Sequence, residues 1–141
     1  MSSEIAPPAA VADALHSAAI RLLRLVRSED AKAGIGPAQL SALSVLVFSG
    51  GKTLGELAAV EQVRPPTMSR IADGLVQRHL AQRVSVPGDR RAVRISATPQ
   101  GRKLLLAGKA RRVRALTKRL ENLTKEELSI LQRAAQLMVR V

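Results

Sequence analysis

The chain has 141 residues, which suits one domain with or without helical extensions, and its 23 Lys and Arg against 11 Asp and Glu give a formal charge of +12. Cysteine is absent, which excludes disulfides, thiolate metal sites and thiol-based redox switches. A single aromatic residue disfavours single-strand binding by base stacking, so the strong positive charge points to duplex DNA as the partner.

The first part of the chain is predicted to be helical. Apolar residues at helical spacing predict a helix over 9–33. A second helix is predicted over 37–48, because it begins with a proline that suits a first turn. The segment Thr53-Leu-Gly-Glu56 has the pattern of a capping box and predicts a short helix over 54–60.

The next helix is predicted from Pro65 to about His79, and with the helix before it completes a helix-turn-helix. Its apolar residues form one stripe that would face the core. Its first turns would enter the major groove, where Arg70 could bridge the O6 and N7 atoms of a guanine. The alternative is an ordinary amphipathic helix with a solvated polar face. The candidate DNA-binding residues of this recognition helix are Arg64, Pro66, Thr67, Ser69 and Arg70.

Alternating apolar residues then predict two strands, 83–86 and 93–97, joined by a five-residue tip at 87–91. Such a basic hairpin would act as a wing whose arginines enter a narrow minor groove. The alternative is a solvated turn in which proline, glycine and aspartate serve turn chemistry alone. The candidate DNA-binding residues of the wing are Asp89, Arg90 and Arg91.

Two helices are predicted after the hairpin. The first runs from Pro99 to about Leu120, and a second capping box at 124–127 opens a last helix that ends near residue 139. Together with the first helix of the chain, these two helices carry more apolar side chains, including Leu104 and Leu105, than a small winged helix can cover. This excess favours a two-fold interface between subunits over packing within a monomer. The candidate dimerisation residues are Leu15, Leu22, Val113, Leu116, Leu120, Leu131 and Met138.

The expected fold class is therefore mainly α with a small β-hairpin wing, a winged helix-turn-helix flanked by N- and C-terminal dimerisation helices. Three segments are expected: an N-terminal arm and dimerisation helix over 1–36, the DNA-binding domain over 37–98, and C-terminal dimerisation helices over 99–141. A dimer would present two recognition helices about 34–36 Å apart, the spacing of a pseudo-palindromic operator.

The tract from Thr53 to Gly101 resembles the winged-helix core of the MarR family of bacterial regulators. The resemblance implies four helices, two strands and two further helices, an obligate homodimer, and regulation relieved by a small ligand. It also places Asp89 and Arg91 at the wing tip. The residues that carry it are Leu54, Leu57-Ala58, Val63-Arg-Pro-Pro-Thr67, Ser69-Arg70, Leu75, Asp89-Arg-Arg91 and Thr98-Pro-Gln-Gly101; Val86 and Ala97 depart from the family's usual residues.

These features predict a homodimeric, sequence-specific regulator of transcription that binds double-stranded DNA, a repressor released by a small-molecule ligand of unidentified chemistry. An architectural protein that coats duplex DNA without choosing sequence is the alternative that charge alone would favour. No cofactor, metal or catalytic acid–base pair is expected, which argues against an enzyme. Without a signal peptide or a long apolar run, we expect a cytoplasmic protein with no membrane partner.

Overall fold

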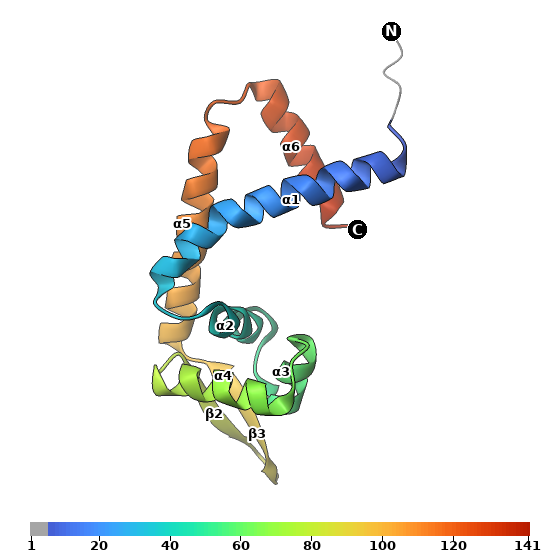
Figure 1. Ribbon diagram of the computed structural model, residues 1–141. Helices are drawn as coiled ribbons and strands as arrows, with labels where there is room; N and C mark the ends of the chain where they lie inside the picture. Colours follow the sequence, from blue (N-terminus) through green and yellow to red (C-terminus); the bar gives the residue numbers. More distant parts are fainter. Residues whose placement is uncertain (1–5) are drawn as a thin grey trace. The chain divides into compact units, whose positions relative to one another are not determined.

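The computed structural model describes residues 6–141, except for the side chains of Arg90 and Arg91. Within that range it has six α-helices, one short 3-10 helix and a three-stranded antiparallel sheet, drawn in Figure 1. The predicted mainly α fold with a hairpin wing is confirmed. In chain order the elements are α1 (Pro8–Asp30), η1 (Ala31–Ala33), α2 (Pro37–Ser49), β1 (Lys52–Thr53), α3 (Leu54–Val60), α4 (Pro65–Gln77), β2 (Ala81–Val86), β3 (Asp89–Ala97), α5 (Pro99–Leu120) and α6 (Lys125–Met138).

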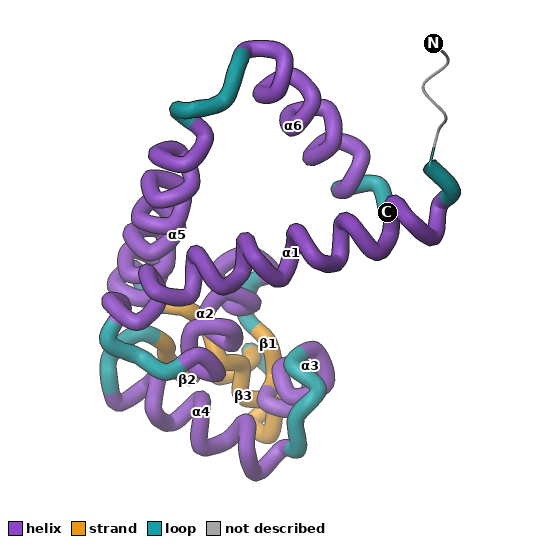
Figure 2. The backbone as a smooth tube through the Cα atoms, turned by 45° about the horizontal axis from the view of Figure 1, so that its top comes forward, coloured by secondary structure: helices purple, strands orange, loops and turns teal. Residues whose placement is uncertain are grey.

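The chain divides into two compact units: residues 28–110, and the residues up to 27 together with 111–141. The unit of residues 28–110 is the winged helix, in which α2, α3 and α4 surround a core completed by the sheet and the start of α5 (Figure 2). Burial of these apolar side chains is the main force that holds the three helices together. The buried core consists of Ala42, Leu43, Leu46, Leu57, Ala58, Met68, Ala72, Leu75, Leu80, Ala81, Ile95 and Leu105.

Both predicted capping boxes are present and fix where α3 and α6 begin. The Thr53 hydroxyl accepts a hydrogen bond from the Glu56 N–H at 3.2 Å, and the Glu56 carboxylate accepts one from the Thr53 N–H at 3.0 Å. Thr124 and Glu127 make the same reciprocal pair at the start of α6. Each box satisfies two backbone donors that a helix N-terminus leaves without an intrahelical acceptor.

The sheet differs from the predicted hairpin in two respects. A third strand, β1, pairs with β3 through Lys52 opposite Ile95, so the strand order is β1-β3-β2. The turn proper is only Pro87-Gly88, where Gly88 has φ +86°, and β3 already begins at Asp89. The pairing shifts register after Ser85, so the regular ladder still ends close to the predicted tip.

The Thr98-Pro-Gln-Gly101 segment locks the start of α5 against the link between α4 and β2. The Thr98 hydroxyl donates to the His79 carbonyl at 2.6 Å and accepts from the Gly101 N–H at 3.0 Å. A Cβ at Gly101 would collide with the Leu80 carbonyl oxygen and lie 3.1 Å from Leu43 Cδ1. This motif is therefore explained by close packing of backbone, which only glycine permits.

The other unit has a different character, because none of its described side chains is buried. Large apolar side chains on α1 and α6 and in the second half of α5 are left open to solvent. Leu105, which the sequence assigned to the same apolar surface, instead lies in the core of the winged helix, and Leu104 packs against that core. Over residues 6–141 no single helix is long and apolar enough to cross a membrane; α1 with η1 and α2 meet those criteria only together, as a bent pair.

Candidate nucleic-acid interface

The amphipathic pattern of α4 determines which side chains it offers to a partner. Met68, Ala72 and Leu75 lie at i, i+4 and i+7 and are buried in the core. The opposite side of the first two turns is open, with Thr67 and Arg70 one turn apart. Of the five residues predicted for this surface, Arg64, Pro66, Thr67 and Arg70 are exposed and Ser69 is half-buried.

The N-terminus of α4 offers fewer free amides than a typical helix. Pro65 and Pro66 occupy its first two positions and have no N–H, and the Met68 N–H is already bonded to the Arg64 carbonyl at 3.1 Å. The Thr67 N–H is the amide that remains in this turn. The helix dipole still favours an anion here, but side chains must supply most of the direct contacts.

Both helices of the helix-turn-helix end in a Schellman motif built on a residue other than glycine. After α3, Gln62 has φ +54° and the Val63 N–H reaches the Ala58 carbonyl at 3.0 Å. After α4, His79 has φ +59° and the Leu80 N–H reaches back to the Leu75 carbonyl at 2.9 Å. His79 thus has a structural position at the end of α4.

An ion pair joins α4 to the wing. Asp73, the acid of α4, accepts a hydrogen bond from the Arg83 guanidinium on β2. Both side chains are about half exposed, so solvent screens the attraction and the pair adds little to stability. The pair offsets the negative charge of Asp73 on this helix.

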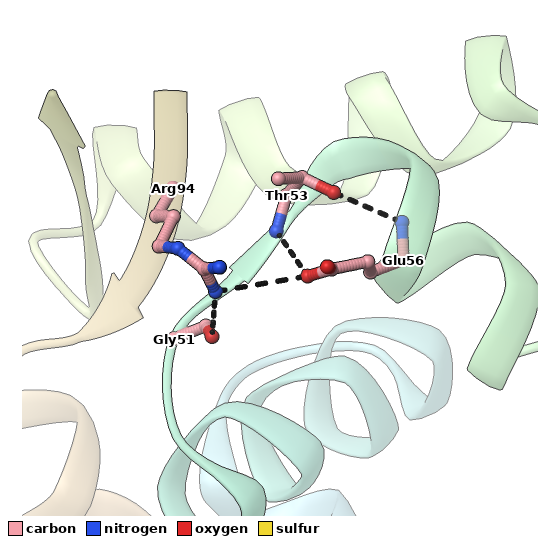
Figure 3. Close-up of polar contacts among 4 residues, drawn as sticks. All are labelled: Gly51, Thr53, Glu56 and Arg94. Carbon is pink, nitrogen blue, oxygen red and sulfur yellow. Dashed lines mark hydrogen bonds and ion pairs between the residues drawn. The ribbon is translucent and has the colours of Figure 1, made fainter. Parts of the chain in front are cut away.

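A second polar cluster joins α3 to the other strand of the wing (Figure 3). Arg94 on β3 donates from Nη1 to the Gly51 carbonyl at 3.0 Å, and the same atom lies 3.7 Å from Glu56 Oε2. The pKa of Glu56 is lowered from its ordinary value, chiefly because its carboxylate accepts the Thr53 N–H and also because Arg94 and Lys52 are nearby cations. The capping box of Thr53 and Glu56 was predicted, but the contacts of Arg94 were not, since Arg94 is 43 residues from Gly51 in the chain.

The wing residues are described only in part. Asp89 is exposed, and β3 includes positions 90 and 91, but the side chains of Arg90 and Arg91 lie outside the described part of the structure. The outer part of the hairpin is open to solvent, with Val84 and Val93 each about two-fifths exposed.

The seven residues predicted for dimerisation all lie in the unit without a core, on α1, the second half of α5 and α6. His16 is exposed on α1, and no group of three or more His, Asp and Glu within residues 6–141 could hold a metal ion.

A helix-turn-helix whose second helix exposes Thr67 and Arg70, with an adjoining β-hairpin, defines a winged helix-turn-helix DNA-binding protein. The comparisons with known proteins agree. The sequence profile of the MarR family matches residues 33–92. A helix-turn-helix transcriptional regulator of Mycobacterium bovis is 37% identical over 93% of this chain and 92% of its own length.

Two other proteins extend these comparisons. The Bacillus subtilis transcriptional repressor MdtR is 33% identical over 69% of this chain and 63% of its own length. The crystal structure of RV1404 from Mycobacterium tuberculosis superposes with a TM-score of 0.86, covering 100% of this chain and 98% of that one at 24% identity. The chain belongs to the MarR family: it is a DNA-binding transcriptional regulator and not an enzyme.

Proposed function

We propose that the protein acts as a homodimeric repressor that binds a pseudo-palindromic operator and is released from it by a small-molecule ligand. Each recognition helix would occupy a major groove and each wing the neighbouring minor groove. Repression is supported by the similarity to MdtR, whose name describes it as a repressor. Release by a small-molecule ligand is proposed from the resemblance to the family.

The observation that carries this proposal is the division of α4 into a buried stripe and an exposed, polar first half. Thr67 and Arg70 project from the same side of the helix, while Met68 and Ala72 anchor the opposite side in the core. A helix held in this way can present hydroxyl and guanidinium donors to base edges without reorganising. Arg64 and Pro66 at the helix start, with the half-buried Ser69, complete the proposed surface.

The wing is proposed to contribute Asp89, Arg90 and Arg91. Exposure of the outer hairpin supports a wing that extends beyond the core and can reach a neighbouring groove. Two arginines at its tip suit the negative potential of a narrow minor groove. Asp89 would orient one of them by a charge-assisted hydrogen bond.

The dimer is proposed from the unit that has no buried side chain of its own. Leu15, Leu22 and Leu131 are 42%, 53% and 45% exposed, far more than apolar side chains in a finished core. A second copy would cover them by the same patch on both subunits, as two-fold symmetry requires. The proposed segments remain 1–36 and 99–141 for dimerisation and 37–98 for DNA binding.

The decisive experiment is selection of bound sites from random duplex DNA at about 0.15 M salt. A regulator should recover a palindrome with half-sites one helical turn apart and prefer it over random DNA by at least roughly 10³-fold. Strong binding without a recovered motif would instead establish the architectural alternative, in which the charge of +12 coats DNA indiscriminately.

Two variants test the residue assignments on the selected site. Arg70→Ala should lower the ratio of specific to random affinity, because it removes a guanine contact worth about 1–3 kcal/mol. Arg91→Ala should weaken operator binding severely while sedimentation shows an intact dimer. Lys125→Ala, at the start of α6, serves as the control for simple loss of a cation. Retained operator affinity in Arg91→Ala at physiological salt would contradict the wing assignment.

A further inference from the structure

We propose that Arg94 and Glu56 are positioning residues for DNA recognition: their contact fixes the base of the wing to the helix-turn-helix, so that Arg94 serves specificity without binding a phosphate. This inference rests on the proposed function, because it presumes that the wing and α4 read the operator together. It concerns two residues that are not among the candidate DNA-binding residues of the recognition helix or the wing.

The contact joins parts of the chain that must keep a fixed relation in the complex. Thr53 on β1 lies directly opposite Arg94 on β3 in the antiparallel ladder, so the guanidinium reaches across the strand pair towards the start of α3 (Figure 3). Its Nη1 atom donates to the Gly51 carbonyl at 3.0 Å and lies 3.7 Å from Glu56 Oε2. One side chain on the wing thereby contacts both the residue before β1 and the first turn of α3.

The helix end of this contact is itself held firmly. Glu56 is already fixed by the capping box, because its carboxylate accepts the Thr53 N–H at 3.0 Å and its own N–H donates to the Thr53 hydroxyl. Since α3 packs on α4, a strand fixed to α3 is also fixed relative to the recognition helix. The other strand of the wing is tied to α4 itself by the pair of Asp73 and Arg83.

The same geometry argues against Arg94 as a phosphate ligand. The Nη1 atom of the guanidinium is already directed at a carbonyl acceptor and a carboxylate, so a phosphate would have to use the remaining N–H donors and approach the carboxylate. The negative charge of Glu56 cancels much of the local attraction for DNA.

A positioning role and a phosphate-binding role for Arg94 give opposite predictions for the effect of Glu56→Gln on DNA affinity, and different ones for Arg94→Gln. Glutamine at position 56 can still complete the capping box, so the variant removes the ionic contact while α3 keeps its start. If the pair positions the wing, each variant should lower the ratio of operator to random-DNA affinity by roughly two- to fivefold, the range expected for an exposed ion pair. The double variant should lose no more than either single one, because the two residues act through each other.

The measurement is equilibrium binding of the full-length protein to the selected operator and to random duplex, titrated from about 50 to 200 mM salt. Positioning predicts an unchanged slope of log Kobs against log[salt] in both single variants, whereas loss of a phosphate contact makes this negative slope less steep by about 0.9 in Arg94→Gln. A less steep slope in Arg94→Gln, tighter DNA binding by Glu56→Gln, or an unchanged affinity ratio in both would overturn the proposal. Circular dichroism and sedimentation at the assay concentration establish that each variant is folded and keeps its oligomeric state.

Arg70→Gln, measured alongside, reports on the proposed function separately. If α4 contacts DNA as proposed, this variant lowers the affinity ratio whatever happens at Glu56 and Arg94. A normal ratio in Arg70→Gln with an altered one in Glu56→Gln would refute the guanine contact proposed for Arg70 and support the positioning role of Glu56 and Arg94. The reverse result would refute the positioning pair alone.

Discussion

Replacing Gly101 by alanine should destabilise the winged helix, although alanine normally favours a helix. The added Cβ would collide with the Leu80 carbonyl oxygen, approach the Leu80 carbonyl carbon to 2.9 Å and lie 3.1 Å from Leu43 Cδ1. Backbone atoms cannot swing aside as a flexible side chain can, so the cost should be near the upper end of overpacking, about 3 kcal/mol. A helix-propensity gain of up to about 1 kcal/mol offsets part of it, leaving a net loss of roughly 2 kcal/mol.

Gly55→Ala is the matched control, because the same substitution in α3 places its Cβ where no atom lies within 4 Å. It should stabilise the protein by about 0.4–1 kcal/mol. Urea unfolding at one fixed protein concentration measures both variants, since a dimer's stability depends on concentration. If Gly101→Ala unfolded at the same or a higher urea concentration than the parent, the close approach of α5 to Leu80 would be wrong.

Three further predictions concern other parts of the fold. The pKa of Glu56 is lowered on folding, so the ionised carboxylate contributes its full stability above the ordinary carboxylate pKa and loses it as the pH falls through the lowered value. The unfolding midpoints of the parent and of Glu56→Gln should therefore converge in acid. A gap that stays constant with pH would contradict the hydrogen bond from the Thr53 N–H to this carboxylate. His79→Gly should raise the free energy of unfolding, measured by urea unfolding, by about 1 kcal/mol, because glycine adopts the left-handed conformation without the steric cost of a histidine side chain. A lower free energy of unfolding in this variant would argue against the Schellman ending of α4. Leu131→Glu should convert the proposed dimer to monomers in sedimentation velocity, whereas Lys125→Glu on the same helix should not; an intact dimer in Leu131→Glu would move the interface elsewhere.

The sequence was sufficient to predict the helices, because local signals set their ends. The capping boxes at Thr53 and Thr124 and the prolines that begin α2, α4 and α5 placed every helix after α1 within a few residues of its observed bounds. The apolar stripe of α4 likewise identified the side that is buried. These features depend on residues within one or two turns of each other, which a single sequence displays directly.

Features that depend on distant pairing were not predictable in the same way. Strand β1 has two residues, too few to show alternation, and exists because Lys52 meets Ile95. The left-handed conformations of Gln62 and His79 carry no glycine signal, and the turn at Pro87-Gly88 proved shorter than the predicted tip. The pairs that tie the wing to the helices join side chains brought together only by the finished fold.

Those pairs also change what the charge of the chain means. Composition marks every arginine in the winged helix as a candidate for DNA, yet Arg78 donates to the Gly34 carbonyl at 2.8 Å, Arg83 pairs with Asp73, and Arg94 contacts Gly51 and Glu56. Each of them still adds to the long-range field that draws DNA towards the protein, since that attraction requires no contact. Affinity for a particular sequence would depend instead on the few donors free to reach the bases, and in our proposal Arg94 helps to hold these donors in place from within the protein.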